Sequence, residues 1–235
     1  MKAKEEIRMN IWKYMEKNEI ALPPRPCYYK VPNFIGSRYA ANRLARISKF
    51  RNAKIVYVAQ DPPLVHVREE VLRSGKLLIT SSYKLKRGFL ILDPSQLSPN
   101  AIRIAVSLRG AMRYGRIVKP GSNYKVDMFV IGSVAVSTDG ARVGRGGGYS
   151  DLEYGILREM GIVKKDTLVA TIVHECQIVD SIPMEMHDVP VDIISTPVRV
   201  LETKTSYKKP PGIIWDLITV DIVNEVPILR QLSGF

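Results

Sequence analysis

The sequence of 235 residues is poor in cysteine and has no long apolar run. Its two cysteines, Cys27 and Cys176, are too few for a disulfide framework, and no Cys-x-x-Cys pair indicates a structural zinc site. No apolar stretch approaches the roughly 18 residues needed to span a bilayer. The charged N-terminus lacks the apolar core of a signal peptide, so we expect a reduced, cytoplasmic setting.

Acidic residues are scarce in the first half of the chain. Residues 1–118 contain 23 Lys and Arg against 8 Asp and Glu, a net charge of +15, whereas the remainder carries −3. The first half is therefore predicted to meet an anion, with nucleic acid, a nucleotide or a polycarboxylate metabolite as candidates, unless its basic residues serve only solubility. Tyr28–Lys30 and Tyr83–Arg87 interleave aromatic and basic residues, a pattern found in RNA-binding surfaces and in ordinary surface loops.

Apolar residues make up 46% of the chain, enough to build a sizeable core. We find no internal repeat and no low-complexity segment. The length suits one domain over residues 1–235, with a basic, helical N-terminal part at 1–50 and an α/β core at 51–235.

Short apolar runs rich in β-branched residues alternate with helical patterns. The runs predict strands at Ile55–Ala59, Leu77–Thr80, Val126–Val136, Leu168–Val173 and Val191–Ser195. Apolar spacing predicts helices over residues 4–17, 36–50, Val65–Arg73 and Asp151–Met160. This alternation predicts an α/β fold with a mainly parallel sheet flanked by helices, in which ligands lie beyond the C-terminal ends of the strands.

A glycine-rich stretch from Arg142 to Asp151 is the strongest functional signal. It follows a predicted strand, a turn and a short return strand, and it leads into a helix. Ser150 with Glu153 three residues later predicts a capping box at the start of that helix, and Gly161 predicts its end. Glycines allow backbone N–H groups to surround an anion, and a helix N-terminus adds its own free N–H groups.

Charged side chains in this stretch suit a bound phosphate. Arg142 and Arg145 offer fork-shaped donors for phosphate oxygens, and Asp151 is placed to hold Mg²⁺ beside them. The same residues also fit a tight turn with a capped helix. The pattern lacks the Gly-Lys-Ser/Thr of a Walker A loop and the spacing of a dinucleotide-binding fingerprint. We therefore interpret the loop as a nucleotide phosphate site, most simply for ATP.

The residues from Asp139 to Asp151 resemble the signature of the 5-formyltetrahydrofolate cyclo-ligases, also called methenyltetrahydrofolate synthetases, which runs D-x-x-G-x-R-L-G-x-G-x-G-Y-Y-D. His187–Pro197 is similar to a second family segment, h-D-x-x-h-D-x-h-h-T, with h apolar. A group called methenyltetrahydrofolate synthetase domain-containing proteins is more similar still. The resemblance to this group extends over Pro32–Ser37, Gly132–Ser137, Asp151–Tyr154, Thr171–Gln177, Thr196–Val200 and Pro210–Trp215, and so covers nearly the whole chain.

The resemblance implies a fold of the NagB/RpiA/CoA-transferase-like kind and a reaction in which ATP drives closure of 5-formyltetrahydrofolate to 5,10-methenyltetrahydrofolate. It implies Mg²⁺ held by Asp151 and Asp192, and a nucleotide contacted by Lys4 and Arg8. The loop residues that match the nucleotide site are Arg142, Gly144, Arg145, Gly146, Gly147, Gly148 and Tyr149. Among them, Arg145 and Tyr149 are assigned the catalytic role.

The sequence departs from the family pattern at two places. Ser150 stands where the family carries a second tyrosine, a residue associated with the substrate site. The folate-contacting stretch of the family has no clear counterpart, and Glu69 or Glu70 is the candidate for its carboxylate. A reduced folate or another pterin is thus the expected substrate. The alternatives are a diverged nucleotide-binding or RNA-associated module on the same fold and a different ATP-using ligase or phosphotransferase.

Overall fold

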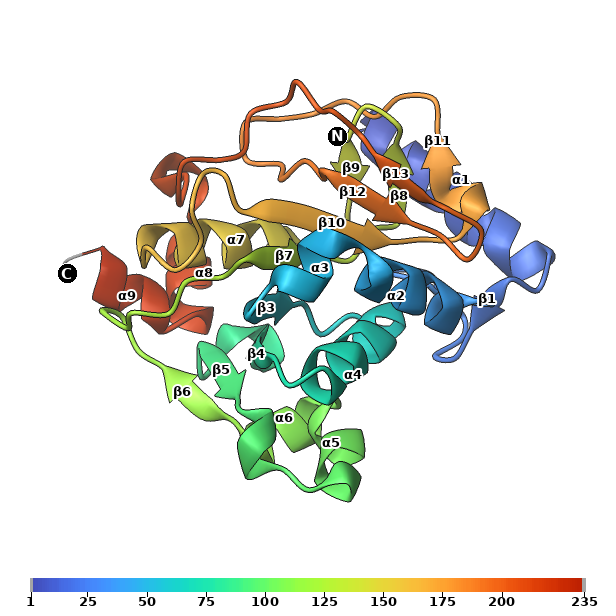
Figure 1. The fold of residues 1–235 in the computed structure, drawn as a ribbon. Coiled ribbons are helices and arrows are strands. Elements are labelled where there is room, and N and C mark those ends of the chain that lie inside the picture. The colour runs from blue at the N-terminus through green and yellow to red at the C-terminus, as the bar shows by residue number, and fades with distance from the viewer. Residues whose placement is uncertain (1, 234–235) are drawn as a thin grey trace.

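An eight-stranded mixed sheet with helices on both faces forms the centre of the computed structural model, which describes residues 2–233 (Figure 1). The strands are β1 (Ala21–Leu22), β2 (Asn33–Phe34), β3 (Ile55–Val58), β4 (Leu77–Ser81), β5 (Phe89–Leu92), β6 (Arg116–Val118), β7 (Met128–Val130), β8 (Ala135–Ser137), β9 (Arg142–Val143), β10 (Leu168–Ile172), β11 (Ile178–Val179), β12 (Ile193–Ser195) and β13 (Val200–Glu202). The helices are α1 (Lys2–Lys17), α2 (Ser37–Arg46), α3 (Ser48–Asn52), α4 (Val65–Arg73), α5 (Pro99–Ala105), α6 (Leu108–Tyr114), α7 (Tyr149–Glu159), α8 (Val220–Glu225) and α9 (Ile228–Leu232), with short 3-10 turns between them.

The five central strands of the large sheet run parallel. Its order is β13-β12-β10-β7-β3-β4-β5-β6, and every pair from β12 to β4 is parallel. The edge strands β13, β5 and β6 pair antiparallel. The predicted α/β fold with a mainly parallel sheet is therefore confirmed. The antiparallel edge escaped prediction because β5, buried along its whole length, shows the same apolar pattern as a parallel strand.

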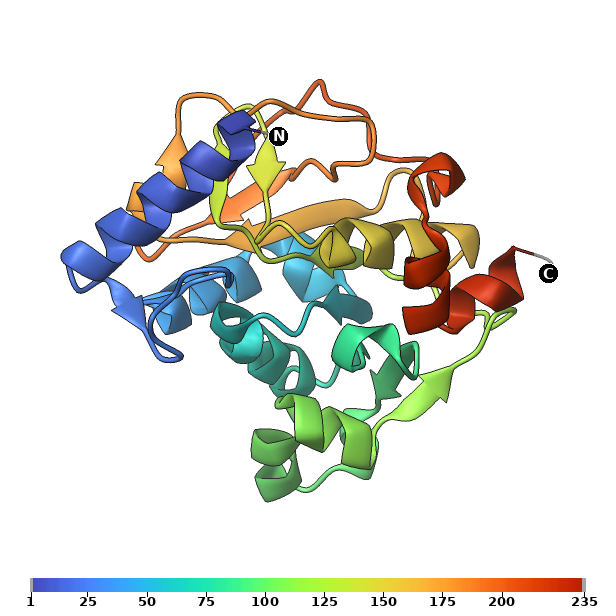
Figure 2. The same ribbon diagram turned by 180° about the vertical axis from the view of Figure 1, so that it is seen from behind.

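Helices cover both faces of this sheet. α2 packs on β10 and β12, and α4 packs on β3 and β4, whereas α7 lies on the opposite face (Figure 2). On that side α1 contacts β8. Buried apolar side chains from α1 through to α9 belong to one connected core. Within residues 2–233, every helix is too short or too polar to serve as a transmembrane segment.

Several predicted helices and strands are confirmed, but two predicted elements are interrupted. The helix expected at Val65–Arg73 is α4, but the one expected over residues 36–50 breaks at the extended Ile47 into α2 and α3. The single strand expected over Val126–Val136 is wrong: the chain leaves the large sheet after β7, and β8 joins a small sheet of order β11-β8-β9. The break lies at Gly132, where a Cβ would approach Asp61 Oδ2 to 2.1 Å. An apolar run alone cannot reveal such a contact.

Aromatic packing fixes α7 against the sheet. Tyr57 of β3 stacks on Phe129 of β7 with ring centroids 4.1 Å apart, and Tyr154 of α7 meets the same ring edge-on at 5.2 Å. All three side chains are fully buried. The N-terminus of α7 and the glycine-rich stretch before it are thereby held near the C-terminal ends of β3 and β7.

Candidate functional site

The glycine loop, residues Gly144–Gly148, connects β9 to α7. Gly146 has φ +109° and Gly148 has φ +65°, conformations that favour glycine. Gly148 is the N-cap of α7, and no side chain caps the helix. In the described part of the chain, the N–H groups of Gly146, Gly147 and Gly148 donate no hydrogen bond to protein. The loop therefore presents free donors and the positive end of a helix dipole to an anion.

The predicted capping box at Ser150 is wrong. Ser150 is the second residue of α7, and the Glu153 carboxylate accepts a hydrogen bond of 2.6 Å from the Tyr57 hydroxyl instead of reaching the N-cap. The helix begins two residues earlier than expected because Gly148 adopts the left-handed conformation itself. Gly161, with φ +67°, ends the helix as predicted, and its N–H donates to the carbonyl of Arg158.

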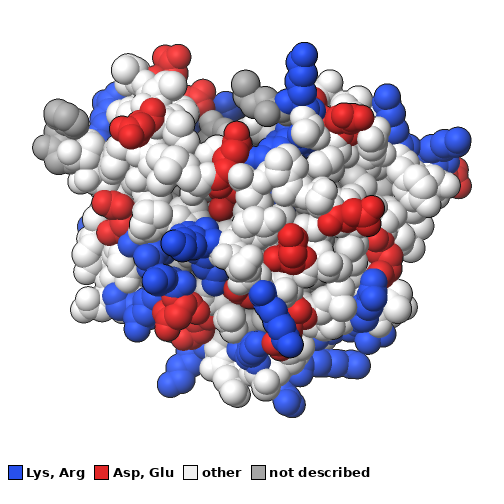
Figure 3. Space-filling model, turned by 90° about the horizontal axis from the view of Figure 1, so that it is seen from above, with Lys and Arg blue, Asp and Glu red and all other residues white. Residues whose placement is uncertain are grey.

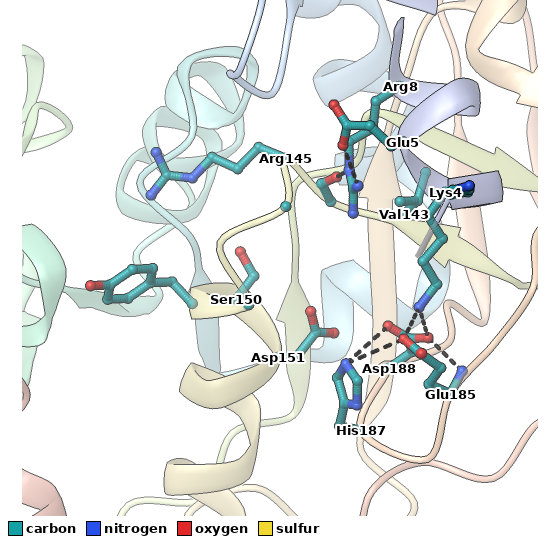
Figure 4. Close-up of a pocket in the computed structure, with 15 residues that line it drawn as sticks. Lys4, Glu5, Arg8, Val143, Arg145, Ser150, Asp151, Glu185, His187 and Asp188 are labelled. Atoms are coloured by element: carbon teal, nitrogen blue, oxygen red, sulfur yellow. Dashed lines mark hydrogen bonds and ion pairs between the residues drawn. The ribbon is translucent and has the colours of Figure 1, made fainter. Parts of the chain in front are cut away.

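A cavity of about 580 Å³ lies between the glycine loop, α1 and residues 185–188 (Figure 4). Its charged lining includes the basic residues Lys4, Arg8 and Arg145 and the acidic residues Glu5, Asp151, Glu185 and Asp188. Arg8 Nη1 lies 2.9 Å from Glu5 Oε2. Arg8 Nε donates to the Gly144 carbonyl at 2.7 Å, so α1 is tied directly to the loop. Arg145 is exposed and lies 6.0 Å from the ring centroid of Tyr149. The structure thus brings Lys4, Arg8 and the loop residues together from distant parts of the sequence.

Lys4 is neutralised by two carboxylates. Its Nζ lies 2.5 Å from Asp188 Oδ2 and 2.7 Å from Glu185 Oε2. Burial lowers the pKa of Lys4, but the hydrogen bonds with Asp188 and Glu185 outweigh it, so the net pKa is raised. Ligand atoms of Glu185, His187 and Asp188 lie within 4.8 Å of one another, a spacing that suits a cation. The Lys4 ammonium already serves as that cation.

Arg142 does not line the cavity, because its side chain is buried behind the loop. The guanidinium donates to the carbonyls of Val189 and Gly132 and forms a short ion pair with Asp151. The Val189 N–H donates to the same carboxylate oxygen, Asp151 Oδ1, at 2.9 Å. Oδ2 accepts no hydrogen bond from the described residues and remains available at the cavity. Arg142 therefore orients Asp151.

Asp192 lies away from this cavity. Its Oδ2 accepts from the Val169 N–H at 2.7 Å and from Lys209 Nζ at 2.6 Å. The residue precedes β12, so it belongs to the N-terminal ends of the parallel strands, whereas the loop lies at their C-terminal ends. The geometry gives no support to the predicted role of Asp192 as a second magnesium ligand. Of the two aspartates in that segment, Asp188 is the one beside the loop.

A second hollow of about 240 Å³ adjoins the first and shares Arg145, Tyr149 and Ser150 with it. Two carboxyl groups, Asp61 and Glu153, line this second hollow. Desolvation raises the pKa of Glu153 to about 7, although hydrogen bonds from Ser81 and Tyr57 oppose the shift.

The second hollow also contains a buried carboxyl group with a raised pKa and a buried amide donor for which residues 2–233 provide no hydrogen-bond partner. Desolvation raises the pKa of Asp61, and this shift is partly offset by the charges of Arg145, Arg68 and Arg142. Gln60 Nε2 is buried without a hydrogen-bond partner among the described residues. An unsatisfied buried donor beside two carboxyl groups with raised pKa values indicates a candidate site for a polar ligand.

Glu69 and Glu70 do not reach the second hollow. Both lie on α4 beside a separate surface depression, and Glu69 pairs with Arg73 at 2.8 Å and with Arg38 at 3.5 Å. The carboxylates that sequence reasoning missed are Asp61 and Glu153. The sequence could have indicated Asp61, because this residue follows the buried strand β3 at the edge of the sheet where ligands bind in such folds. No sequence pattern indicates Glu153, because its side chain faces inward only through the packing of α7.

The fold and the glycine loop define an α/β protein with a glycine-rich loop and a helix N-terminus at the C-terminal ends of its parallel strands. Residues 1–197 match the model of the 5-formyltetrahydrofolate cyclo-ligase family, and the chain belongs to that family. The fold is shared with 5,10-methenyltetrahydrofolate synthetase of Aquifex aeolicus, with a TM-score of 0.54, 20% identity, and coverage of 87% of this chain and 95% of that one.

Similarity over nearly all of this chain is found to methenyltetrahydrofolate synthase domain-containing proteins. The human protein is 41% identical over 237 residues, covering 99% of this chain and 62% of its own length. The mouse protein is 40% identical over 235 residues, covering 98% and 63%. The zebrafish (Danio rerio) protein is 35% identical over 232 residues, covering 97% and 60%. The chain thus spans less than two thirds of the length of these relatives.

Proposed function

We propose that the protein is an ATP- and Mg²⁺-dependent cyclo-ligase that converts 5-formyltetrahydrofolate to 5,10-methenyltetrahydrofolate with release of ADP and phosphate, within one domain. The observation that carries the proposal is the pair of adjoining hollows that share Arg145, Tyr149 and Ser150. A phosphate donor in the first hollow and an acceptor in the second would meet at these three residues. Family membership supports the choice of reaction.

The residues of the first hollow suit phosphate transfer. The N–H groups of the glycine loop, together with Arg8 and Arg145, neutralise phosphate oxygens, and catalysis of this reaction is mainly positioning and charge neutralisation. Asp151 would hold Mg²⁺ through its free Oδ2, while Arg142 orients the carboxylate. The metal would supply charge neutralisation at the phosphates.

The second hollow suits a polar heterocycle. Asp61, Glu153 and the amide of Gln60 offer donors and acceptors to a pterin edge, and Lys30 and Lys84 at the rim offer charge to carboxylates. The oxygen of the N5-formyl group would take the phosphoryl group from ATP. N10 would then attack the formyl carbon, and phosphate would leave. Ser150, smaller than the tyrosine of the family pattern, leaves room at the junction of the hollows.

Among residues 2–233 we find no feature that is specific to an RNA-associated module. Basic and acidic side chains are interspersed on the face shown in Figure 3. The names of the relatives refer to folate chemistry. We therefore propose the small-molecule reaction as the function.

The direct test mixes the purified protein with Mg-ATP and 5-formyltetrahydrofolate and follows methenyl absorbance together with ADP. We expect equal amounts of both products, and Asp151→Asn should lower kcat about 100-fold, as loss of one electrostatic contact in an active site does. Asp192→Asn is the matched control and should stay within about threefold. ADP release without methenyl product would leave a different ATP-using enzyme, and no product despite ATP binding would refute the proposal.

A further inference from the structure

A third hollow, mostly apolar, lies on the other side of the glycine loop. Its volume is about 290 Å³, and Gly148, Asp151 and His187 line both this hollow and the first hollow, between the glycine loop and α1. Its remaining walls are almost entirely apolar. They include Leu152 of α7 and Ile213, Ile214, Ile218 and Ile222 of the C-terminal segment.

The wall of this hollow comes from outside the family-wide region. Residues 210–222 lie beyond residue 197, where the match to the family model ends. They run beside α7 at close range, because a Cβ at Gly155 would approach the Gly212 carbonyl to 2.9 Å (Figure 2). The Tyr149 hydroxyl donates to Glu225 Oε2 at 2.5 Å and holds α8 against the start of α7. The segment is therefore held against α7 at two points.

We propose that this apolar hollow binds the purine base of the ATP whose phosphates the glycine loop holds; the inference rests on the proposed function. A ligand that fills both hollows must carry an anionic group and an apolar, flat group joined across Gly148, Asp151 and His187. A nucleoside triphosphate has this division, and the half-buried isoleucines offer flat apolar surface to a ring. The C-terminal segment thus completes the nucleotide site.

The test compares the affinity of ATP with that of inorganic tripolyphosphate, both with Mg²⁺, by calorimetry. Ile222→Asp places a charge in the wall, and we expect it to raise the Kd of ATP at least about tenfold, because burial of the ring in the apolar wall is lost. The Kd of tripolyphosphate should change less than about twofold. Ile222→Ala keeps the wall uncharged and should raise the Kd of ATP about threefold. This second variant tests the inference even if Ile222→Asp folds poorly.

Val220→Asp is the matched control, because it places the same charge on the first turn of the same helix at a side chain that is 76% exposed. It should leave both affinities unchanged. Unchanged ATP affinity in both Ile222 variants would overturn the inference, as would an equal loss of ATP and tripolyphosphate. Weaker binding of 5-formyltetrahydrofolate alone would assign the hollow to the folate and also overturn it. A wild-type protein that binds neither phosphate compound would instead refute the proposed function.

Discussion

Glu153 shows how burial changes the chemistry of a single residue. Its side chain is buried and accepts a hydrogen bond from the Tyr57 hydroxyl at 2.6 Å, yet it also lines the second hollow. Water is excluded from most of its surface, so the charged form is costly and the pKa rises to about 7. A carboxyl group that titrates near neutral pH can donate or accept a proton at a bound heterocycle.

The raised pKa of Glu153 predicts a pH-dependent stability. The folded protein keeps the proton up to about pH 7, whereas the unfolded chain loses it near the ordinary value of 4.5, so the free energy of unfolding falls as pH rises through this window. Glu153→Gln should lack this fall, which amounts to roughly 3 kcal/mol at most, since one pKa unit is about 1.4 kcal/mol. Urea denaturation across the window measures it.

The exposed Glu6→Gln on α1 is the control for this measurement and should follow the wild-type profile. If Glu153→Gln and the wild type lose stability in parallel between these pH values, the assigned pKa of Glu153 is wrong.

At the scale of elements, the start of α7 decides the geometry of the site. The helix begins from Gly148, which has a positive φ, and the residues of its first turn line the cavity between the glycine loop and α1. Arg142 on β9 and the backbone N–H of Val189 both donate hydrogen bonds to Asp151 of the first turn. The loop, the helix and the cavity wall therefore form one unit, and a substitution at the N-cap Gly148 should alter the geometry of all three.

Gly148 gives a test of that unit. A Cβ at Gly148 meets no atom within 4 Å, so a substitution there costs only backbone strain. Gly148→Ala should lower the free energy of unfolding by about 1–2 kcal/mol, because alanine resists the left-handed conformation. Gly148→Asn should lose less, since asparagine tolerates that conformation and caps helices well. Equal losses in urea denaturation would show that the φ of Gly148 does not determine the cost.

At the scale of the whole molecule, the C-terminal segment is part of the fold and not an appendage. Val226 and Leu229 are fully buried, and Ile228 lies near Gly88, which follows β4 in the chain. The same segment lines the third hollow, and its Glu225 accepts a hydrogen bond from Tyr149, the first residue of α7. Stability and nucleotide binding are thus both expected to depend on residues beyond the family-wide region.

Leu229→Ala tests the structural half of that statement. The substitution should cost about 2–5 kcal/mol of unfolding free energy, the range for a leucine removed from a packed core. Val220→Ala on the neighbouring helix α8, 76% exposed, should change it by no more than about 0.5 kcal/mol. A loss at Leu229 as small as that at Val220 would mean that the segment is not packed as described.

The sequence by itself determined the α/β class, the glycine-rich connection between a strand and a helix, and the family. These follow from local patterns, since apolar periodicity, glycine spacing and a helix after a loop all act between near neighbours. Several predicted strands and helices, including α4, were placed correctly for the same reason.

Only the tertiary structure decided which carboxylates face the site. Asp188 and Asp192 are four residues apart, yet one lies beside Lys4 and the other beside Lys209. Glu69 turns away to Arg73, whereas Glu153 reaches Tyr57 from another element. The packing of α7, α1 and the C-terminal segment on the sheet sets these directions, and contacts of 96 to 184 residues in separation leave no trace in local pattern.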